Sequence, residues 1–140
     1  MKVFIFLLFI GVFISSCDKE DQGMSDTNCI PVIISTLQYS ETPPGQVNIV
    51  EAEVSDDCLT VSLGVGGCDV NHTINMISDG GIDESFPSQI TFDFKDEQPQ
   101  LCKAYFVIER KFDLLPIRDL TDEDIVLRFR NSAVSVMYIK

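Results

Sequence analysis

The chain has 140 residues, and removal of an export segment at 1–16 leaves 124 (140 less 16), a length typical of one domain, since domains usually hold about 100–200 residues. Because 45% of the residues are hydrophobic and alternate with polar ones beyond the leader, the chain is neither disordered nor a polytopic membrane protein. Ten Lys and Arg against 22 Asp and Glu give a net charge of -12, which repels nucleic acid and anionic lipid head groups and excludes a nucleic-acid-binding module.

The amino terminus has the three parts of a secretory signal peptide. Met1-Lys2 supplies a positive charge, Val3–Ile14 is apolar but for one glycine, and Ser15-Ser16 are small residues ahead of Cys17. An apolar helix of twelve residues covers about 18 Å of a hydrocarbon layer that is ~30 Å thick, so it is too short for a permanent anchor. The pattern predicts a signal peptide over 1–16 that is removed from the mature protein.

The residues Ile14-Ser15-Ser16-Cys17 resemble a bacterial lipobox. This resemblance implies that Cys17 is diacylated, freed by cleavage and then N-acylated. The alternative is an ordinary secretory signal that ends near a cysteine. Since each buried CH₂ is worth ~0.8 kcal/mol, three acyl chains would hold the protein firmly on a membrane.

Residues 17–28 form a polar stretch without an apolar period, which is typical of a tether. Within it, Lys19-Glu20-Asp21 resembles the export signal that sends surface lipoproteins of the Bacteroidota to the outer leaflet. The alternative is that these charges only solvate the tether.

Four cysteines remain beyond Cys17, namely Cys29, Cys58, Cys68 and Cys102. An even number in an oxidising compartment predicts two disulfides, and four cysteines allow three pairings. We favour Cys29–Cys58 with Cys68–Cys102, because each bridge would join distant segments and stabilise the fold by about 2–4 kcal/mol. Zinc binding and a thiol nucleophile are disfavoured, since the chain has no C-x-x-C pair and a single histidine.

Short segments of period two, separated by glycine, proline and acidic clusters, predict strands over most of residues 29–140. About eight strands at even spacing favour an all-β domain, a single antiparallel β-sandwich that is immunoglobulin-like in plan. A single helical turn is expected around Leu120–Asp124. The expected strands are Val32–Gln38, Gln46–Val54, Leu59–Val65, Val70–Ser78, Gln89–Phe94, Ala104–Phe112, Ile125–Arg130 and Val134–Ile139.

Alternation within these strands predicts which residues enter the core. Apolar residues of one parity alternate with polar ones in three strands, so each has one wet face. In contrast, Ala104–Ile108 is nearly continuously apolar and is expected to be a central strand that is buried on both faces. The expected core residues are Leu59, Val61, Leu63, Val65, Ile90, Phe92, Phe94, Ile125, Leu127 and Phe129.

Catalytic chemistry has little support in the sequence, and we expect no enzyme and no cofactor. His72 is the single histidine, so a Ser-His-Asp or Cys-His arrangement would have to use it. Its parity matches that of Val70, Ile74 and Met76, which favours a hydrogen-bonded core residue over a general base. No nucleophile elbow, P-loop or H-E-x-x-H pattern is present.

Acidic clusters leave two chemical alternatives open, acid–base catalysis by paired carboxylates and calcium binding. The best calcium candidate is Asp79 with Asp83 and Glu84, because Gly80 and Gly81 would let carboxylates and carbonyls converge. It lacks the D-x-[DN]-x-[DN]-G pattern, and a solvated loop is the favoured interpretation.

The order D-C-L at Asp57, G-G-C at Gly66-Gly67-Cys68, His72, and S-x-P at Ser85 resembles a set of small uncharacterised Bacteroidota lipoproteins and, faintly, NigD-like lipoproteins. The resemblance covers residues 57–115. It implies an envelope lipoprotein of β-sandwich type with no catalytic residue. Its shared residues have structural roles: a tight reversal at the glycines, a Cys68–Cys102 bridge, and a histidine that satisfies backbone groups.

These observations favour a membrane-anchored protein-interaction module of the cell envelope, held at the outer membrane by its lipid, and exposure at the cell surface is one alternative for its location. Its partners would be the membrane, through Cys17, and an envelope protein. A carboxylate-based hydrolase and a purely structural envelope component are the alternatives. Since the chain has no tryptophan and three tyrosines, a stacking platform for glycans is disfavoured.

Overall fold

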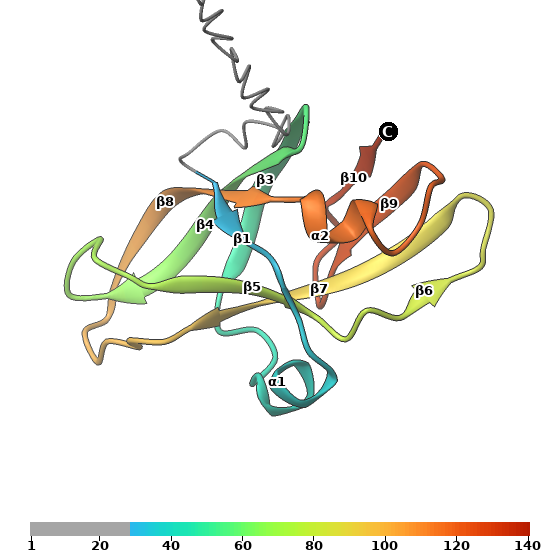
Figure 1. Ribbon diagram of the computed structural model, residues 1–140. Helices are drawn as coiled ribbons and strands as arrows, with labels where there is room; N and C mark the ends of the chain where they lie inside the picture. Colours follow the sequence, from blue (N-terminus) through green and yellow to red (C-terminus); the bar gives the residue numbers. More distant parts are fainter. Residues whose placement is uncertain (1–28) are drawn as a thin grey trace, which may run out of the picture.

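The structure, a computed structural model, describes residues 29–140 (Figure 1). The expected signal peptide (1–16) and tether (17–28), including Cys17 and Lys19–Asp21, lie outside the described residues. Residues 29–140 form ten strands and two short helices. In chain order they are β1 (Ile30–Pro31), β2 (Ile33–Ile34), α1 (Thr36–Glu41), β3 (Asn48–Ser55), β4 (Cys58–Gly67), β5 (Ile74–Ser78), β6 (Ile82–Asp83), β7 (Ser88–Asp96), β8 (Ala104–Asp113), α2 (Leu115–Arg118), β9 (Ile125–Phe129) and β10 (Ser135–Tyr138).

The strands form two sheets, which confirms the all-β sandwich. One sheet has the order β1-β8-β4-β3, and the other has the order β10-β9-β7-β5-β2 with β6 beside β7. The expectation of purely antiparallel pairing is wrong, because β1 with β8, β2 with β5, and β7 with β9 are parallel pairs. Strands β7 and β9 are parallel because the chain crosses to the other sheet between them, forms β8 there, and then re-enters their own sheet in the direction of β7.

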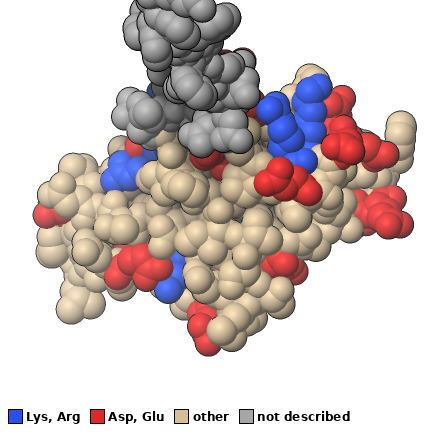
Figure 2. All heavy atoms as spheres, viewed as in Figure 1, with Lys and Arg blue, Asp and Glu red and all other residues tan. Residues whose placement is uncertain are grey.

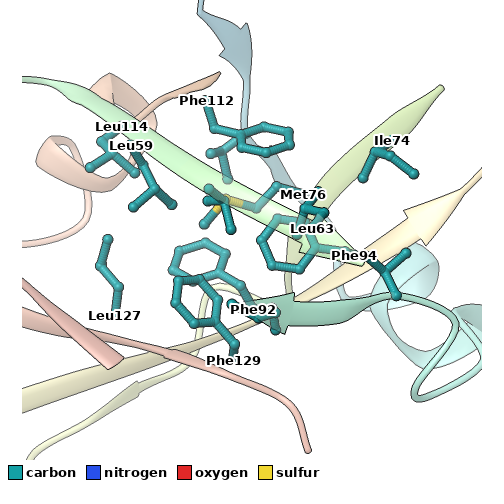
Figure 3. Packing of buried hydrophobic residues seen from close by; sticks show 14 of the residues in the cluster. Leu59, Leu63, Ile74, Met76, Phe92, Phe94, Phe112, Leu114, Leu127 and Phe129 are labelled. Carbon is teal, nitrogen blue, oxygen red and sulfur yellow. The ribbon is translucent and has the colours of Figure 1, made fainter. Parts of the chain in front are cut away.

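The core lies between the sheets, where the predicted parity is confirmed. The inward apolar residues of β4, β7 and β9 are at most 3% exposed, while alternate residues such as Thr60 and Thr91 are partly exposed. Phe94 packs against Phe112 and Phe129 with ring centroids 5.5 and 5.6 Å apart (Figure 3). Full burial of one large apolar side chain contributes about 1.5–3 kcal/mol to stability, so strands β4, β7 and β9 supply much of the stabilisation of the fold.

The predicted strand Val32–Gln38 is wrong in its second half, which forms α1. Ser35 adopts an extended conformation and its hydroxyl accepts a hydrogen bond from the Gln38 N–H at 3.3 Å, so a cap ends β2 and begins the helix. In Figure 1, α1 lies on the outer side of the sheet that contains β5 and β7. The apolar run Val32–Ile34 concealed this capping signal.

The helical turn expected at Leu120–Asp124 is also misplaced. Helix α2 lies five residues earlier, at Leu115–Arg118, with Pro116 in its first turn. Proline suits that position because its fixed φ is helical and it has no N–H to leave unpaired.

The expectation that Ala104–Ile108 is buried on both faces is wrong. Strand β8 lies between β1 and β4 in the sheet order, but β1 pairs only with its last residues, Phe112 and Asp113. The outward side chains of Tyr105 and Val107 are 60% and 56% exposed. The short length of β1 therefore leaves most of β8 at a sheet edge.

Candidate functional site

Two disulfides join the ends of β4 to other segments, and the predicted pairing is confirmed. Cys58, the first residue of β4, is bonded to Cys29, and Cys68, which follows the last residue, is bonded to Cys102. The bridges span 29 and 34 positions of sequence. The strand that carries Leu59, Val61, Leu63 and Val65 is thus held covalently at both ends.

His72 lies in the connection before β5, so the expected strand Val70–Ser78 begins only at Ile74. Val70 is 51% exposed, whereas His72 is 5% exposed. The Nδ1 of His72 lies 2.6 Å from Asp96 Oδ2, and its Nε2 lies 3.1 Å from the carbonyl oxygen of Asp69. Both ring nitrogens are therefore engaged by protein oxygens, away from solvent.

Gln100 completes this arrangement, which we term the His72 corner (Gly67–Thr73, Asp96 and Gln100). Its Oε1 accepts hydrogen bonds from the N–H groups of Cys68 and Asp69. Its Nε2 donates to Asp69 Oδ1 at 3.0 Å and to the carbonyl of Asn71 at 3.2 Å. The side-chain amide thus forms hydrogen bonds with backbone groups of residues 68–71, which follow the end of β4 beside the Cys68–Cys102 bridge.

The expected reversal at Gly66-Gly67 is wrong, because both glycines are extended residues at the end of β4. Positive φ occurs among the described glycines at Gly45 and Gly80 instead. Gly67 is needed for close approach: a Cβ there would lie 2.6 Å from both Gln100 Oε1 and His72 Nε2. At Gly66, the nearest atom to such a Cβ is 3.9 Å away.

The carboxylate clusters do not assemble a metal site. Within residues 29–140, no group of three or more His, Cys, Asp or Glu side chains is placed to hold a metal ion. Asp79 of the calcium candidate accepts a hydrogen bond from the Gly81 N–H at 2.9 Å, while Asp83 and Glu84 are exposed. The structure therefore does not bring Asp79, Asp83 and Glu84 together as ligands.

Asp57, at the turn between β3 and β4, is fixed by two partners. The Tyr138 hydroxyl donates to its Oδ1 at 2.5 Å, and Arg118 contacts the same oxygen at 2.7 Å. Burial, followed by the bond to Asp57, raises the pKa of Tyr138 to about 12. This carboxylate therefore joins the carboxyl-terminal strand to the hairpin and is not available as a paired catalytic acid.

A buried ion pair on the outer side of the second sheet had no signal in the sequence. Arg130 lies 3.0 Å from Asp93 and 4.0 Å above the Tyr39 ring, and it donates to the carbonyls of Tyr39 and Thr42 at 3.3 Å. Asp93 is 6% exposed, and burial raises the pKa of its carboxyl group. Parity predicts that Asp93 and Arg130 lie on a wet face, and α1 covers them.

The outer edge of β8 is an unpaired backbone segment that bears exposed apolar side chains; β3 forms the opposite edge of the same sheet. Between Ala104 and Lys111, β8 pairs with β4 on one side, and no strand of residues 29–140 pairs with it on the other. The Tyr105 ring lies over Gly64, at the place where a Cβ on that glycine would be. The edge therefore combines free backbone groups with exposed Tyr105 and Val107.

A shallow cleft of about 490 Å³ lies between the loop that joins β6 to β7 and the connection that precedes β9. Its lining includes Ile82, Glu84, Phe86, Ser88, Leu120 and Glu123. The Phe86 side chain is fully exposed, and Leu120 is 39% exposed.

No protein-family model matches the chain, and no curated protein matches it. The structure resembles the crystal structure of a protein of unknown function, DUF1344, from Bacteroides vulgatus ATCC 8482, with a TM-score of 0.52 and 13% sequence identity. The match covers 81% of this chain and 56% of that protein, so this chain spans little more than half its length. The similarity shows a shared fold.

In residues 29–140, no helix is both long and apolar enough to cross a membrane.

Proposed function

We propose that this chain is a lipid-anchored lipoprotein of the bacterial cell envelope, of the small Bacteroidota type, whose sandwich binds another envelope protein by strand addition at β8. The anchor rests on the leader, the lipobox at Cys17 and the polar tether. Two disulfides within the domain agree with an oxidising compartment.

The observation that carries the binding role is the open edge of β8. In an antiparallel strand, alternate residues direct their N–H and C=O groups to opposite sides. An edge strand therefore presents unpaired groups that an extended segment of a partner can pair with, while neighbouring side chains give specificity. Exposed Tyr105 and Val107 on Ala104–Lys111 provide such side chains.

The hydrolase alternative has less support. His72 is enclosed, with both nitrogens in contact with protein oxygens, and Asp96, its carboxylate partner, is 7% exposed. A general base must reach the proton that it abstracts from a substrate.

Site-specific photocrosslinking in intact cells tests the binding role. A photoreactive residue in place of Val107 should give a discrete crosslinked product with one partner protein. The matched control replaces Val50, a valine of β3 with a similar exposure of 49%. The same products from both positions, or none from position 107, contradict strand addition at β8.

Metabolic labelling with a fatty-acid analogue tests the anchor separately. The intact chain should incorporate the label and Cys17→Ala should not. Equal labelling of both proteins, or absence of label from the intact chain, contradicts the lipid anchor.

A further inference from the structure

The cleft between the β6–β7 loop and the connection before β9 has the size of a ligand site. Its volume of about 490 Å³ lies within the ~300–1,000 Å³ range of pockets that bind small groups. The loop on one side is ordered by its own contacts: Ile82 pairs with Ile90, the Ser85 hydroxyl donates to the Pro87 carbonyl at 2.9 Å, and Gln89 donates to Ser85 at 2.8 Å.

Phe86 stands at the rim of this cleft with its side chain fully exposed. An aromatic ring with a free face attracts cations, because its π-system is negative above and below the ring plane. Leu120, across the cleft, offers a partly exposed apolar surface.

The polar lining is acidic. Glu84 and Glu123 both line the cleft, and no lysine or arginine does. Within residues 29–140, neither glutamate forms a salt bridge, and Glu123 accepts only a long hydrogen bond of 3.4 Å from Ser88. In Figure 2, acidic side chains gather toward the right-hand end, with basic side chains beside them at its upper edge; Figure 1 places β6 and the loop before β9 at this end.

Lys140, whose ammonium group contacts Thr121 of the cleft lining, forms no salt bridge with these glutamates among residues 29–140. Lys140 donates to the carbonyls of Ile117 and Thr121, and its N–H donates to Asp124 at 3.1 Å. Its ammonium group is thus bound by backbone carbonyls of α2 and of the segment between α2 and β9.

From an aromatic face, two unpaired carboxylates and an apolar wall, we infer that this cleft binds an arginine side chain of a partner protein. The guanidinium stacks on Phe86 and pairs with Glu84 and Glu123, while its aliphatic stem covers Leu120. A planar guanidinium fits this set better than an ammonium, since it can stack on a ring and donate to two carboxylates at once. This site is independent of strand addition at β8.

The test uses a short capped peptide that contains one arginine between glycines, added to the full ¹⁵N-labelled chain in a non-ionic detergent. Amide signals of residues 82–86, 88 and 120–123 should shift in proton–nitrogen correlation spectra. A peptide with citrulline, the neutral isostere, should shift them little. Shifts located elsewhere, or equal shifts with citrulline, overturn the proposal.

Three variants separate this site from general attraction to an acidic protein. Glu84→Gln with Glu123→Gln should weaken binding about three- to tenfold, and Phe86→Leu should weaken it about two- to fivefold. The matched control, Glu51→Gln with Glu53→Gln, removes two exposed carboxylates of β3 and should leave binding unchanged. An equal loss in the control shows only non-specific attraction and overturns the site. The spectra also report whether each variant is folded.

Discussion

The adjacent glycines at the end of β4 should respond in opposite ways to the addition of one methyl group. Both are extended, so Ala is compatible with the backbone at either position. Replacement of glycine by alanine in such a conformation reduces the entropy of the unfolded chain and stabilises by about 0.4–1 kcal/mol. Gly66→Ala, whose Cβ meets nothing closer than 3.9 Å, should show this gain.

Gly67→Ala should instead destabilise the protein. Its Cβ would lie 2.6 Å from Gln100 Oε1 and from His72 Nε2, so one of these groups must move. Movement of Gln100 disrupts its bonds to the Cys68 and Asp69 N–H groups, and each lost hydrogen bond costs about 0.5–1.5 kcal/mol. The two bonds together cost about 1–3 kcal/mol, so after subtraction of the entropic gain of about 0.4–1 kcal/mol we expect a net loss of about 1.3 kcal/mol, within a range of about 0–2.6.

Urea unfolding with the disulfides intact measures both variants, and the linear extrapolation gives the free energy of unfolding. Gln100→Ala provides a further check, since addition of Gly67→Ala to it should cost less than Gly67→Ala alone. If Gly66→Ala and Gly67→Ala have the same stability, the close approach at the His72 corner does not restrict position 67.

Three further predictions concern the disulfides and two buried side chains. Replacement of Cys29 and Cys58 by alanine should lower the free energy of unfolding by about 3.6 kcal/mol, and replacement of Cys68 and Cys102 should lower it by about 3.8 kcal/mol, because the bridges close loops of 29 and 34 positions. The two losses should add, since the loops do not overlap. Strongly unequal or non-additive urea midpoints contradict this. Because the pKa of Tyr138 is raised to about 12, its contribution to stability is complete below about pH 10 and is lost as the pH rises through 12. In Tyr138→Phe, the free energy of unfolding should therefore fall by about 1–2 kcal/mol less over this alkaline range than in the wild type. An unchanged alkaline unfolding profile contradicts this prediction. Because burial raises the pKa of Asp93, its contribution to stability is complete below the ordinary aspartate value and is lost as the pH rises above the folded value. Asp93→Asn should therefore flatten the acid-side pH dependence of thermal unfolding, and an unchanged pH dependence contradicts this.

The core was predictable because, where one face of a sheet is buried and the other is exposed to solvent, the alternation of apolar and polar residues shows which side chains of a strand point into the core. Leu63 and Phe92 follow this rule, and a shift of one residue would expose every apolar side chain of the strand. The disulfide pairing was predictable only in part. Loop length disfavours a Cys58–Cys68 bridge, but it does not separate the observed pairing from Cys29–Cys68 with Cys58–Cys102.

The candidate surfaces were less predictable, because they depend on what covers a residue rather than on its type. Asp93 and Thr91 have the same parity, but α1 covers Asp93 through Arg130 and Tyr39. Tyr105 and Val107 resemble core residues in sequence, but they lie on the outward face of β8 and are exposed. The backbone edge beside them is open because β1 ends after two residues. Local sequence does not specify how far a neighbouring strand extends.

The position of the Cys29–Cys58 bridge relates the proposed anchor to the proposed binding edge. Residue 29 is the first described residue, and its partner Cys58 pairs with Asp113 at the carboxyl end of β8. The open part of β8, Ala104–Lys111, runs from that end toward the Cys68–Cys102 bridge over about 27 Å, at ~3.4 Å per residue. The proposed tether of twelve residues (17–28) would reach at most about 40 Å if fully extended. If Cys17 carries the lipid, a partner on this edge is held within roughly 70 Å of the bilayer, a distance that another envelope protein can reach.

Photocrosslinks from Val107 should therefore depend on Cys17, and Cys17→Ala should abolish them even though the edge is unchanged. Crosslinks that persist in this variant would show that the edge binds its partner without the anchor.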